Sequence, residues 1–463
     1  MECVSIPPQQ GSGQQGATGA RETALLILKE VEEKEAYLNL VLNRVLIRQA
    51  FSPVERSLLT ELTYGVIQHL QTLDWVISLY SKRPLEKLTP YIRNILRIGT
   101  YQLLYLKRIP VSAAVDESVK LAHRYGHKGV AGLVNAVLRK ISRFKNDLPW
   151  PSREQDPVLY LSLRHAYPLW MVRRWIKNYG FESAAAHCAA GNRRPPLTVR
   201  TNSLFLSRAE LQRILQAEGT ASRECRFAPE GLHLDLATGL TGLKSFQQGL
   251  FQVQGEASML AAPLLNPQPG EQVLDLCSAP GGKTTHLAAL MKNQGRIIAA
   301  DLYPHRLKLV QAAAQRLGIQ IIRTENIDGR ALPAKWQGAF QRVLLDVPCS
   351  GLGVIRRKGD LKWKRRPEDL SALSRLQLQL LQSAFQALCA GGVLLYSACT
   401  TEPEETSELI DRFLAKESLA QPAQLTSFLP PALSAGVEAT GRLFLWPDRH
   451  NLDGFFMARI RKK

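Results

Sequence analysis

The chain has 463 residues, 45% hydrophobic and 21% charged, a globular composition for about three domains that excludes a mainly disordered chain. Its net charge of +19 favours nucleic acid or another anionic surface as partner, with a generally solvated basic surface as the alternative. No apolar run reaches the roughly 18 residues of a membrane span, and the first residues lack the apolar core of a signal peptide, so we expect a cytosolic protein.

The first half of the chain changes character three times. Residues 1–20 are rich in Gln, Gly, Ser and Pro and predict a disordered leader. Apolar residues recur at helical spacing over residues 21–145, which predicts an all-α domain. Prolines and mixed charges over residues 146–157 indicate a linker. Residues 158–245 combine a basic, aromatic helix near residues 168–179 with the alternating segments LTVRTN and GLHLDL, and predict a small α+β connector domain.

Short apolar runs alternate with helical segments in residues 246–463. The first five runs predict a parallel sheet with helices on both faces, and the last two predict a closing antiparallel hairpin. The fold class is therefore α/β, a Rossmann-like domain with a mixed seven-stranded sheet. The predicted strands are residues 273–276, 296–301, 319–323, 342–346, 392–397, 442–446 and 454–460.

A glycine-rich loop joins the first of these strands to a helix. This junction is where open parallel sheets bind ligands. The spacing excludes an ATP-binding P-loop, because Cys277 stands where that loop needs glycine, and it is not the G-x-G-x-x-G loop of nicotinamide enzymes. Lys283, in the first helical turn, opposes the helix dipole, so we expect an anionic group nearby; a surface lysine is the alternative.

Aspartates stand at or just after the ends of the next strands. One such aspartate usually forms a turn or caps a helix. Three that follow one glycine turn, Asp301, Asp328 and Asp346, predict a pocket for an adenosine that carries an amino-acid tail. Asp301 comes about twenty residues after the glycines, the interval at which an acidic side chain meets ribose hydroxyls.

Two of the seven cysteines, Cys349 and Cys399, follow predicted strand ends and should face the same cleft. The absence of a C-x-x-C pair argues against a disulfide framework or a zinc site, and we expect no metal. The D-V-P-C motif lacks the aromatic residue that amino-group methyltransferases place after D-P-P, which points to carbon chemistry. Carbon 5 of a pyrimidine is a poor nucleophile, but a thiolate added at carbon 6 converts it into an enamine that can attack a methyl sulfonium.

These motifs support a family resemblance. C-S-A-P-G-G-K-T, L-L-D-V-P-C-S-G-L-G and Y-S-A-C-T, followed by Pro403-Glu404-Glu405, resemble the RNA cytosine-5 methyltransferases of the Sun/Fmu, NOL/NOP/sun group over residues 246–463. The helical segments VERSLLTELTYGVIQH and PVSAAVDESVKLAHRYGHKGVAGLVNAVLRKI resemble the NusB-type RNA-binding bundle. The combination implies a monomeric enzyme that methylates 16S ribosomal RNA with S-adenosylmethionine as cofactor.

The resemblance also implies roles for individual residues. Cofactor contacts fall on the loop and the three aspartates, with Asp301 at the ribose and Asp328 near the adenine: Cys277, Ser278, Ala279, Pro280, Gly281, Gly282, Lys283, Asp301, Asp328 and Asp346. Asp346 would also position the target base, Cys399 would be the nucleophile, and Cys349 would assist product release. Ser278 stands where alanine is commoner and Ala398 where threonine is usual, and we expect these departures to tune the activity.

The segment 355–369 carries seven basic residues and a tryptophan directly after the P-C motif. A solvated charged loop is the alternative, but such a mixture beside a catalytic pocket suits a flipped-out base and its phosphates. The expected RNA contacts are Arg356, Arg357, Lys358, Lys362, Trp363, Lys364, Arg365 and Arg366. Two other functions remain open from the sequence: a non-catalytic RNA-binding factor, and the same chemistry on DNA or transfer RNA.

Overall fold

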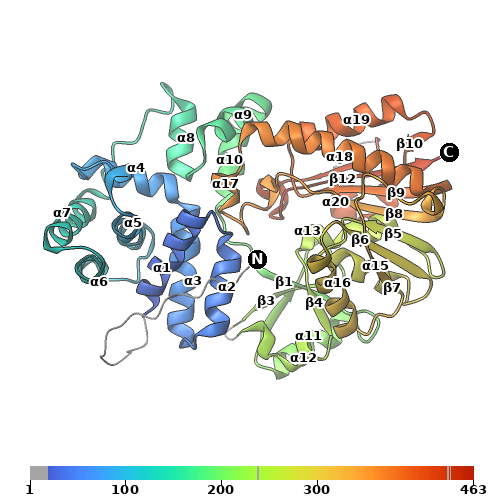
Figure 1. The fold of residues 1–463 in the computed structure, drawn as a ribbon, viewed down its shortest axis with the longest axis horizontal. Helices are drawn as coiled ribbons and strands as arrows, with labels where there is room; N and C mark the ends of the chain where they lie inside the picture. Colours follow the sequence, from blue (N-terminus) through green and yellow to red (C-terminus); the bar gives the residue numbers. More distant parts are fainter. Residues whose placement is uncertain (1–18, 237–238, 435–436, 438–439) are drawn as a thin grey trace. The chain divides into compact units, whose positions relative to one another are not determined.

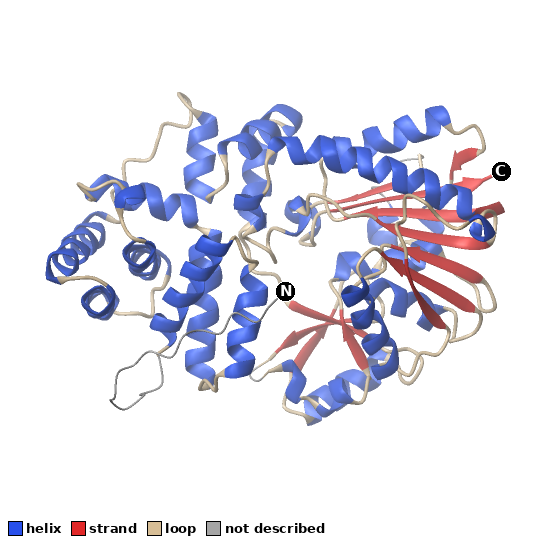
Figure 2. Cartoon of the chain, viewed as in Figure 1, coloured by secondary structure: helices blue, strands red, loops and turns tan. Residues whose placement is uncertain are grey.

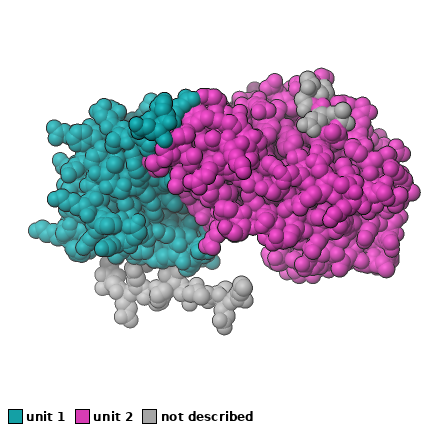
Figure 3. Space-filling model, turned by 90° about the horizontal axis from the view of Figure 1, so that it is seen from above, with its two compact units in different colours: residues 1–155 teal, residues 156–463 magenta. Residues whose placement is uncertain are grey.

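The computed structural model describes residues 19–463 except 237–238, 435–436 and 438–439 (Figure 1). Almost all of the predicted leader therefore lies outside the described residues. The chain divides into two compact units, residues 1–155 and 156–463 (Figure 3). Among the described residues, no helix is both long enough and apolar enough to cross a membrane.

The described part of the first unit is helical. Its α-helices are α1 (Ala20–Lys34), α2 (Leu38–Arg48), α3 (Pro53–Gln68), α4 (Leu70–Tyr80), α5 (Pro90–Tyr105), α6 (Val111–Tyr125) and α7 (Lys128–Phe144). Ser52 caps α3 in a capping box, and Thr89 caps α5. Helix α5 is buried along most of its length, and its Arg97 forms an ion pair with Asp74, with 2.7 Å between Nε and Oδ1.

The second unit begins with three helices and a small antiparallel sheet. The helices are α8 (Pro157–His165), α9 (Leu169–Tyr179) and α10 (Phe181–Gly191). The sheet has the order β2-β3-β1-β4, with β1 (Leu197–Thr201), β2 (Ala221–Glu224), β3 (Gly231–Asp235) and β4 (Phe251–Val253), and α11 (Arg208–Ala217) and α12 (Lys244–Gln247) accompany it. Both predicted strands of this segment are confirmed, because Val199 pairs with Leu232 in an antiparallel ladder.

The larger sheet has the strand order β10-β12-β9-β8-β5-β6-β7, and β11 pairs with β12. Its strands are β5 (Gln272–Leu276), β6 (Arg296–Asp301), β7 (Ile322–Asn326), β8 (Phe340–Asp346), β9 (Leu388–Ala398), β10 (Ala420–Pro422), β11 (Arg442–Leu445) and β12 (Phe455–Lys462). Strands β5 to β9 pair in parallel, and β12 pairs antiparallel to β9. The mixed Rossmann-like sheet is confirmed. Within the described residues it has eight strands rather than seven, because the sequence pattern did not reveal the three-residue β10.

Helices cover both faces of this sheet (Figure 2). Neighbouring residues of one strand, such as Val273 and Leu274 in β5, are both fully buried in separate clusters on opposite faces. That pattern explains the continuous apolar runs. The remaining α-helices of the unit are α13 (Glu256–Met259), α14 (Ala261–Leu265), α15 (Gly282–Leu290), α16 (Pro304–Arg316), α17 (Leu361–Lys364), α18 (Pro367–Ala387), α19 (Ser407–Lys416), α20 (Pro431–Ser434) and α21 (Pro447–His450).

Candidate active site

The glycine-rich loop connects β5 to α15, as the sequence predicted. Gly281 adopts a left-handed backbone with φ of +99°, and a Cβ at this position would lie 3.0 Å from the Cα of Val310. Only glycine allows both this conformation and this close approach. The turn brings the first N–H groups of α15 to the carboxyl edge of the parallel strands, a position suited to an anionic or polar ligand.

Buried polar groups surround this loop. Asp301, at the end of β6, accepts hydrogen bonds from the backbone N–H of Ala279 at 3.3 Å and of Tyr303 at 3.0 Å. Asp275 accepts a hydrogen bond from the Thr284 hydroxyl at 2.6 Å, and burial raises the pKa of Asp275 to about 7.

Two buried oxygens of the loop region are unpaired. Asp275 Oδ1 and Ser278 Oγ have no hydrogen-bond partner among the described residues. Buried polar atoms are normally paired. These two unpaired oxygens therefore indicate that the site suits a ligand with polar groups, such as a nucleoside with an amino-acid tail.

Lys283 is buried, and its Nζ lies 2.6 Å from Oδ1 of Asp346 at the end of β8. The same ammonium lies 5.1 Å from the ring centroid of Phe455 in β12. The anionic group expected beside Lys283 is thus Asp346, and the surface-lysine alternative is wrong. The pair links the helix after the glycine-rich loop to the strand end that precedes Cys349.

The two candidate cysteines lie side by side. Cys349 follows β8 and Cys399 follows β9, and the parallel register pairs Asp346 with Ser397. The two Sγ atoms are 2.8 Å apart. The neighbouring Cys399 sulfur, followed by burial, raises the pKa of Cys349 well above its usual range. Cys349 therefore keeps its proton near neutral pH, and either sulfur can be the donor in the contact between them.

Backbone hydrogen bonds through Gly353 and Gly454 fix the backbone of Cys399. The N–H of Gly353 donates to the carbonyl of Cys399 at 3.0 Å, and the N–H of Gly454 donates to the carbonyl of Gly353 at 2.8 Å. A Cβ on Gly353 would lie 2.0 Å from the carbonyl oxygen of Gly454. The end of β9 and the start of β12 thus meet the P-C segment through backbone contacts that allow no side chain at this position.

The backbone around Cys349 is hydrogen-bonded from two sides. Glu405 Oε1 accepts from the N–H of Ser350 at 2.8 Å, and the amide of Gln377 donates to the carbonyl of Pro348 at 2.9 Å. Arg365 donates to the carbonyl of Ser350 from Nε at 2.8 Å and to the carbonyl of Cys349 from Nη2 at 3.2 Å. We refer to Glu405 and Arg365 as the Cys349 clamp.

The sequence did not reveal this clamp. Glu405 belongs to the Pro-Glu-Glu motif that carries part of the family resemblance, so that motif was the available signal, but it did not indicate a partner. The basic run that contains Arg365 predicts an RNA contact, whereas the structure shows its guanidinium bonded to the backbone of residues 349–350.

Known protein families match three successive parts of the chain. The family model "16S rRNA methyltransferase RsmB/F" matches residues 262–461, the NusB family model matches residues 18–143, and a ferredoxin-like domain of RsmF/B-like methyltransferases matches residues 167–241. The probable ribosomal RNA small subunit methyltransferase B of Bacillus subtilis is 39% identical over 448 residues, which are 96% of this chain and 99% of that protein. The chain belongs to the RsmB/F family of 16S rRNA methyltransferases.

Two further relatives agree with this family. Ribosomal RNA small subunit methyltransferase B of Pseudomonas putida is 36% identical over 88% of this chain and 91% of its own length. The crystal structure of a methyltransferase homologue from Pyrococcus horikoshii has a TM-score of 0.57 and 31% identity, and the match covers 66% of this chain and 99% of that chain. The family resemblance and the fold class predicted from the sequence are confirmed.

In this RsmB/F-family methyltransferase, part of the predicted RNA-contacting segment is buried. The guanidinium of Arg356 donates to the carbonyls of residues 451–452 at 3.0 and 3.1 Å. Lys362 is 0% exposed, and its ammonium donates to the carbonyl of Ala166 at 3.2 Å and to Oδ1 of Asn192 at 2.6 Å. The prediction that Arg356 and Lys362 contact RNA is wrong, because both cations are enclosed and bonded within the protein.

The rest of the segment is more accessible. Arg357 is half-buried and pairs with Asp453 at 2.7 Å, and Lys364 lies 3.6 Å from Asp360. Trp363 and Arg365 are also half-buried. Lys358 and Arg366 are exposed, so they are the strongest remaining candidates for phosphate contacts.

The segment after Cys399 is attached to helix α9. Glu402 is fully buried and accepts a hydrogen bond from the indole N–H of Trp175 at 2.8 Å, and Arg174 pairs with both Glu402 and Glu404. The hydroxyl of Tyr179 donates to the carbonyl of Thr401 at 3.0 Å. The basic, aromatic helix predicted near residues 168–179 therefore supports the segment that carries the candidate nucleophile.

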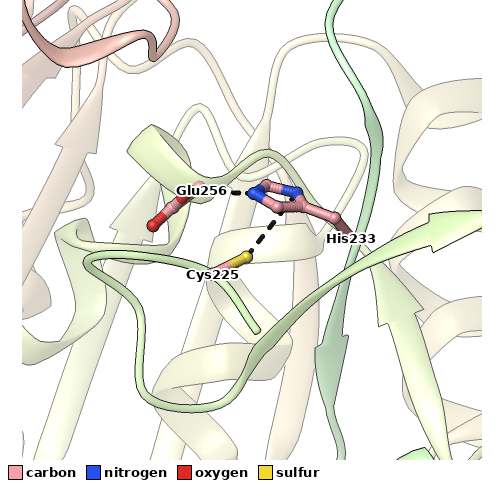
Figure 4. Close-up of side chains that lie close together, drawn as sticks. All are labelled: Cys225, His233 and Glu256. Atoms are coloured by element: carbon pink, nitrogen blue, oxygen red, sulfur yellow. Dashed lines mark hydrogen bonds and ion pairs between the residues drawn. The ribbon is translucent and has the colours of Figure 1, made fainter. Parts of the chain in front are cut away.

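A sulfur, an imidazole and a carboxylate meet in the connector (Figure 4). Cys225 Sγ lies 3.8 Å from Nδ1 of His233, and Glu256 Oε2 lies 3.4 Å from Nε2 of the same ring. These groups can bind metals. However, the Thr198 hydroxyl lies 3.1 Å from Nδ1, and the N–H of Phe227 donates to Glu256. Because protein partners already occupy the imidazole and the carboxylate, we describe this cluster as a hydrogen-bonded link between β3 and α13.

Proposed function

We propose that this methyltransferase forms 5-methylcytosine in 16S ribosomal RNA, with S-adenosylmethionine as the methyl donor. The observation that carries the proposal is the 2.8 Å approach of the Cys349 and Cys399 sulfurs, next to the Lys283–Asp346 pair. Two adjacent thiols at a cofactor edge suit a reaction that needs both a nucleophile and a proton donor. The 16S RNA substrate is taken from the family and from the names of the relatives, and such a substrate agrees with the predicted cytosolic location.

The cofactor is assigned to residues 277–283, Asp301, Asp328 and Asp346. When bound there, it supplies a methyl group on a positively charged sulfur. The unpaired oxygens of Ser278 and Asp275 and the buried carboxylate of Asp301 offer it hydrogen-bond partners. Asp328 forms an ion pair with Arg330 at 2.6 Å, at the exposed rim of this region.

The reaction begins at Cys399. Its thiolate adds to carbon 6 of a flipped-out cytosine, and the electron pair of the carbon 5–carbon 6 double bond becomes available at carbon 5. Carbon 5 would then take the methyl group, and the electron pair of the broken methyl–sulfur bond would stay on the sulfur of the methyl donor. A base removes the carbon 5 proton, the double bond re-forms, and the carbon 6–sulfur bond breaks with its electron pair returning to the Cys399 sulfur.

Cys349 suits the last of these steps. The distance of 2.8 Å between the two sulfurs allows the Cys349 proton to pass to the departing Cys399 thiolate, which leaves the negative charge on the Cys349 sulfur. Protonation of the leaving thiolate prevents its return to carbon 6. Asp346, fixed by Lys283, is assigned to hold the target base.

The test is covalent trapping with RNA that contains 5-fluorocytidine. Fluorine at carbon 5 cannot leave as a proton, so the adduct should persist after methyl transfer. In the presence of cofactor, the wild type and Cys349→Ala should form a protein–RNA species that survives denaturing electrophoresis. Cys399→Ala should form none, and Cys349→Ala should in addition accumulate the adduct with ordinary RNA.

Controls separate binding from chemistry. Cys389→Ala removes another half-buried cysteine, in β9, and should trap like the wild type. Trapping by Cys399→Ala would show that the nucleophile is assigned wrongly. Failure of the wild type to trap, with RNA and cofactor shown to bind, would refute the cysteine-adduct mechanism.

A further inference from the structure

Cys349 lies at the centre of a three-residue turn, residues 348–350, in which four polar backbone groups are hydrogen-bonded to side chains. The carbonyl of Pro348, the N–H of Ser350 and the carbonyls of Cys349 and Ser350 all have side-chain partners, at 2.8–3.2 Å. About two-thirds of the hydrogen bonds in a protein join two backbone groups, so four side-chain hydrogen bonds to three successive residues are a strong restraint. They restrain the backbone from which the Cys349 side chain extends, and none of them involves its sulfur.

Glu405 binds the Cys349 turn although burial of its carboxylate is costly. Its side chain is fully buried, and Oε1 accepts from Ser350 and from the amide of Gln377, both within 2.9 Å. The hydroxyl of Tyr396 donates to the Glu405 backbone carbonyl at 2.7 Å, which fixes the residue in turn. Oε2 has no hydrogen-bond partner among the described residues. Burial of a carboxylate with one oxygen unpaired is unfavourable, so simple stabilisation of a turn does not explain it.

Arg365 restrains the turn from the other side. Its Nε and Nη2 reach two successive carbonyls, and such a forked contact is available to a guanidinium but not to an ammonium. The side chain is half-buried and lies at the end of the short helix α17. A basic residue in the predicted RNA-contacting segment is thereby hydrogen-bonded to the backbone of Cys349.

We propose that Glu405 and Arg365 are positioning residues for product release. They hold the Cys349 sulfur against the Cys399 sulfur, so that the Cys349 proton reaches the thiolate as the carbon 6–sulfur bond breaks. This inference rests on the proposed function, in which the proton lost from carbon 5 goes to a base and the proton gained by Cys399 comes from Cys349. Addition of Cys399 to the base does not require the clamp.

The experiment compares adduct formation with adduct release. Glu405→Ala, Glu405→Gln, Arg365→Ala and Arg365→Lys are incubated with cofactor and ordinary RNA, quenched, and analysed for covalent protein–RNA species. We expect Glu405→Ala and Arg365→Lys to accumulate about 10- to 100-fold more adduct than the wild type, because small displacements of a reacting group have effects of this size. Glu405→Gln keeps an oxygen that can accept from Ser350 and should release product nearly normally.

Matched controls are available on nearby exposed positions. Glu408→Ala in α19 and Arg375→Ala in α18 remove one charge each without touching the Cys349 turn, and should behave like the wild type. Arg365→Lys keeps its charge, so accumulation in this variant reflects lost geometry rather than weaker RNA binding.

The outcomes distinguish the clamp from the proposed function. If 5-fluorocytidine traps the wild type and Cys349→Ala accumulates adduct, but Arg365→Lys and folded Glu405→Ala release product at the wild-type rate, the clamp is overturned and the cysteine mechanism stands. If the wild type does not trap at all, the proposed function itself fails. Should Glu405→Ala not fold, as judged by circular dichroism, Arg365→Lys decides alone.

Discussion

At the scale of single residues, burial determines the chemistry of the charged groups. Asp275 is enclosed in β5 beneath the cofactor loop, and desolvation raises its pKa to about 7. In the unfolded chain an aspartate has a pKa near 3.9, so between these values the folded protein binds a proton that the unfolded chain has released. Stability must therefore fall as the pH rises through this window.

We predict that Asp275→Asn abolishes the part of the fall in stability with rising pH that is due to Asp275. The amide keeps an oxygen that can accept from Thr284 and never ionises. Its advantage over the wild type in the free energy of unfolding should grow by about 2.5 kcal/mol between pH 5 and pH 8, from a pKa shift of about three units. Urea unfolding of both proteins without cofactor at the two pH values measures it, and a gap that stays constant would show that Asp275 ionises normally.

One physical cause explains both the residue that sequence reasoning placed wrongly and the residue that it missed. Lys362 lies in a run of charges that is typical of an exposed loop, but its partners Ala166 and Asn192 are about 170–200 residues away in the chain. Glu405 likewise depends on Ser350. Local patterns locate Cys349 and Cys399 because strand ends are visible in the sequence, whereas the enclosure of a charge depends on distant segments.

At the scale of elements, the candidate active site depends on the contact between the P-C segment after β8 and the residue that precedes β12. The P-C segment passes β12 at Gly353 and Gly454, where two backbones are in contact with no side chain between them. Sequence patterns predicted most strands of the larger sheet. The position predicted for β7 was wrong by about three residues, because the strand is expected at residues 319–323 and lies at Ile322–Asn326. Strand β7 is at the edge of the sheet and largely exposed, and Ile319 enters the core from the preceding turn, so the apolar run marks the turn rather than the strand.

A pair of glycine substitutions tests the contact between Gly353 and Gly454. Gly353→Ala would place Cβ against the Gly454 backbone and should lower the free energy of unfolding by about 1–3 kcal/mol or more, as overpacking does. Gly132→Ala, in α7, meets nothing within 4 Å and should raise helix stability by up to about 1 kcal/mol. Urea midpoints report both changes. Equal midpoints for Gly353→Ala and the wild type would mean that the segment can move apart without cost.

At the scale of the whole molecule, the connector and the methyltransferase sheet belong to one compact unit. Arg200 in β1 is fully buried and donates to the carbonyl of Gly282 at 2.7 Å and to the Thr285 hydroxyl at 3.1 Å. Asn202 donates to the carbonyl of Leu317 at 3.0 Å. The small sheet thus supports the helix that follows the glycine-rich loop.

The charge leads to a prediction on salt dependence. Because Lys358 is exposed and Arg356 is enclosed, only the first should act on RNA directly. Lys358→Ala should lower the slope of log affinity against log salt by about 0.7–0.9, the share of one phosphate contact. Arg356→Ala should instead lower the melting temperature. Filter binding across a salt series and thermal denaturation separate the two, and an unchanged slope for Lys358→Ala would exclude that lysine from the interface.

The position of β12 has a consequence for biosynthesis. This strand is translated after every other strand of its sheet, yet it inserts between β9 and β10 and pairs Phe456 with Ala398, next to the proposed nucleophile. A nascent chain that lacks it leaves the edge of β9 without its antiparallel partner and the backbone of Gly353 without Gly454. We therefore expect the proposed catalytic centre to be complete only after residues 454–462 have been synthesised, and a chain that ends before Gly454 should lack activity.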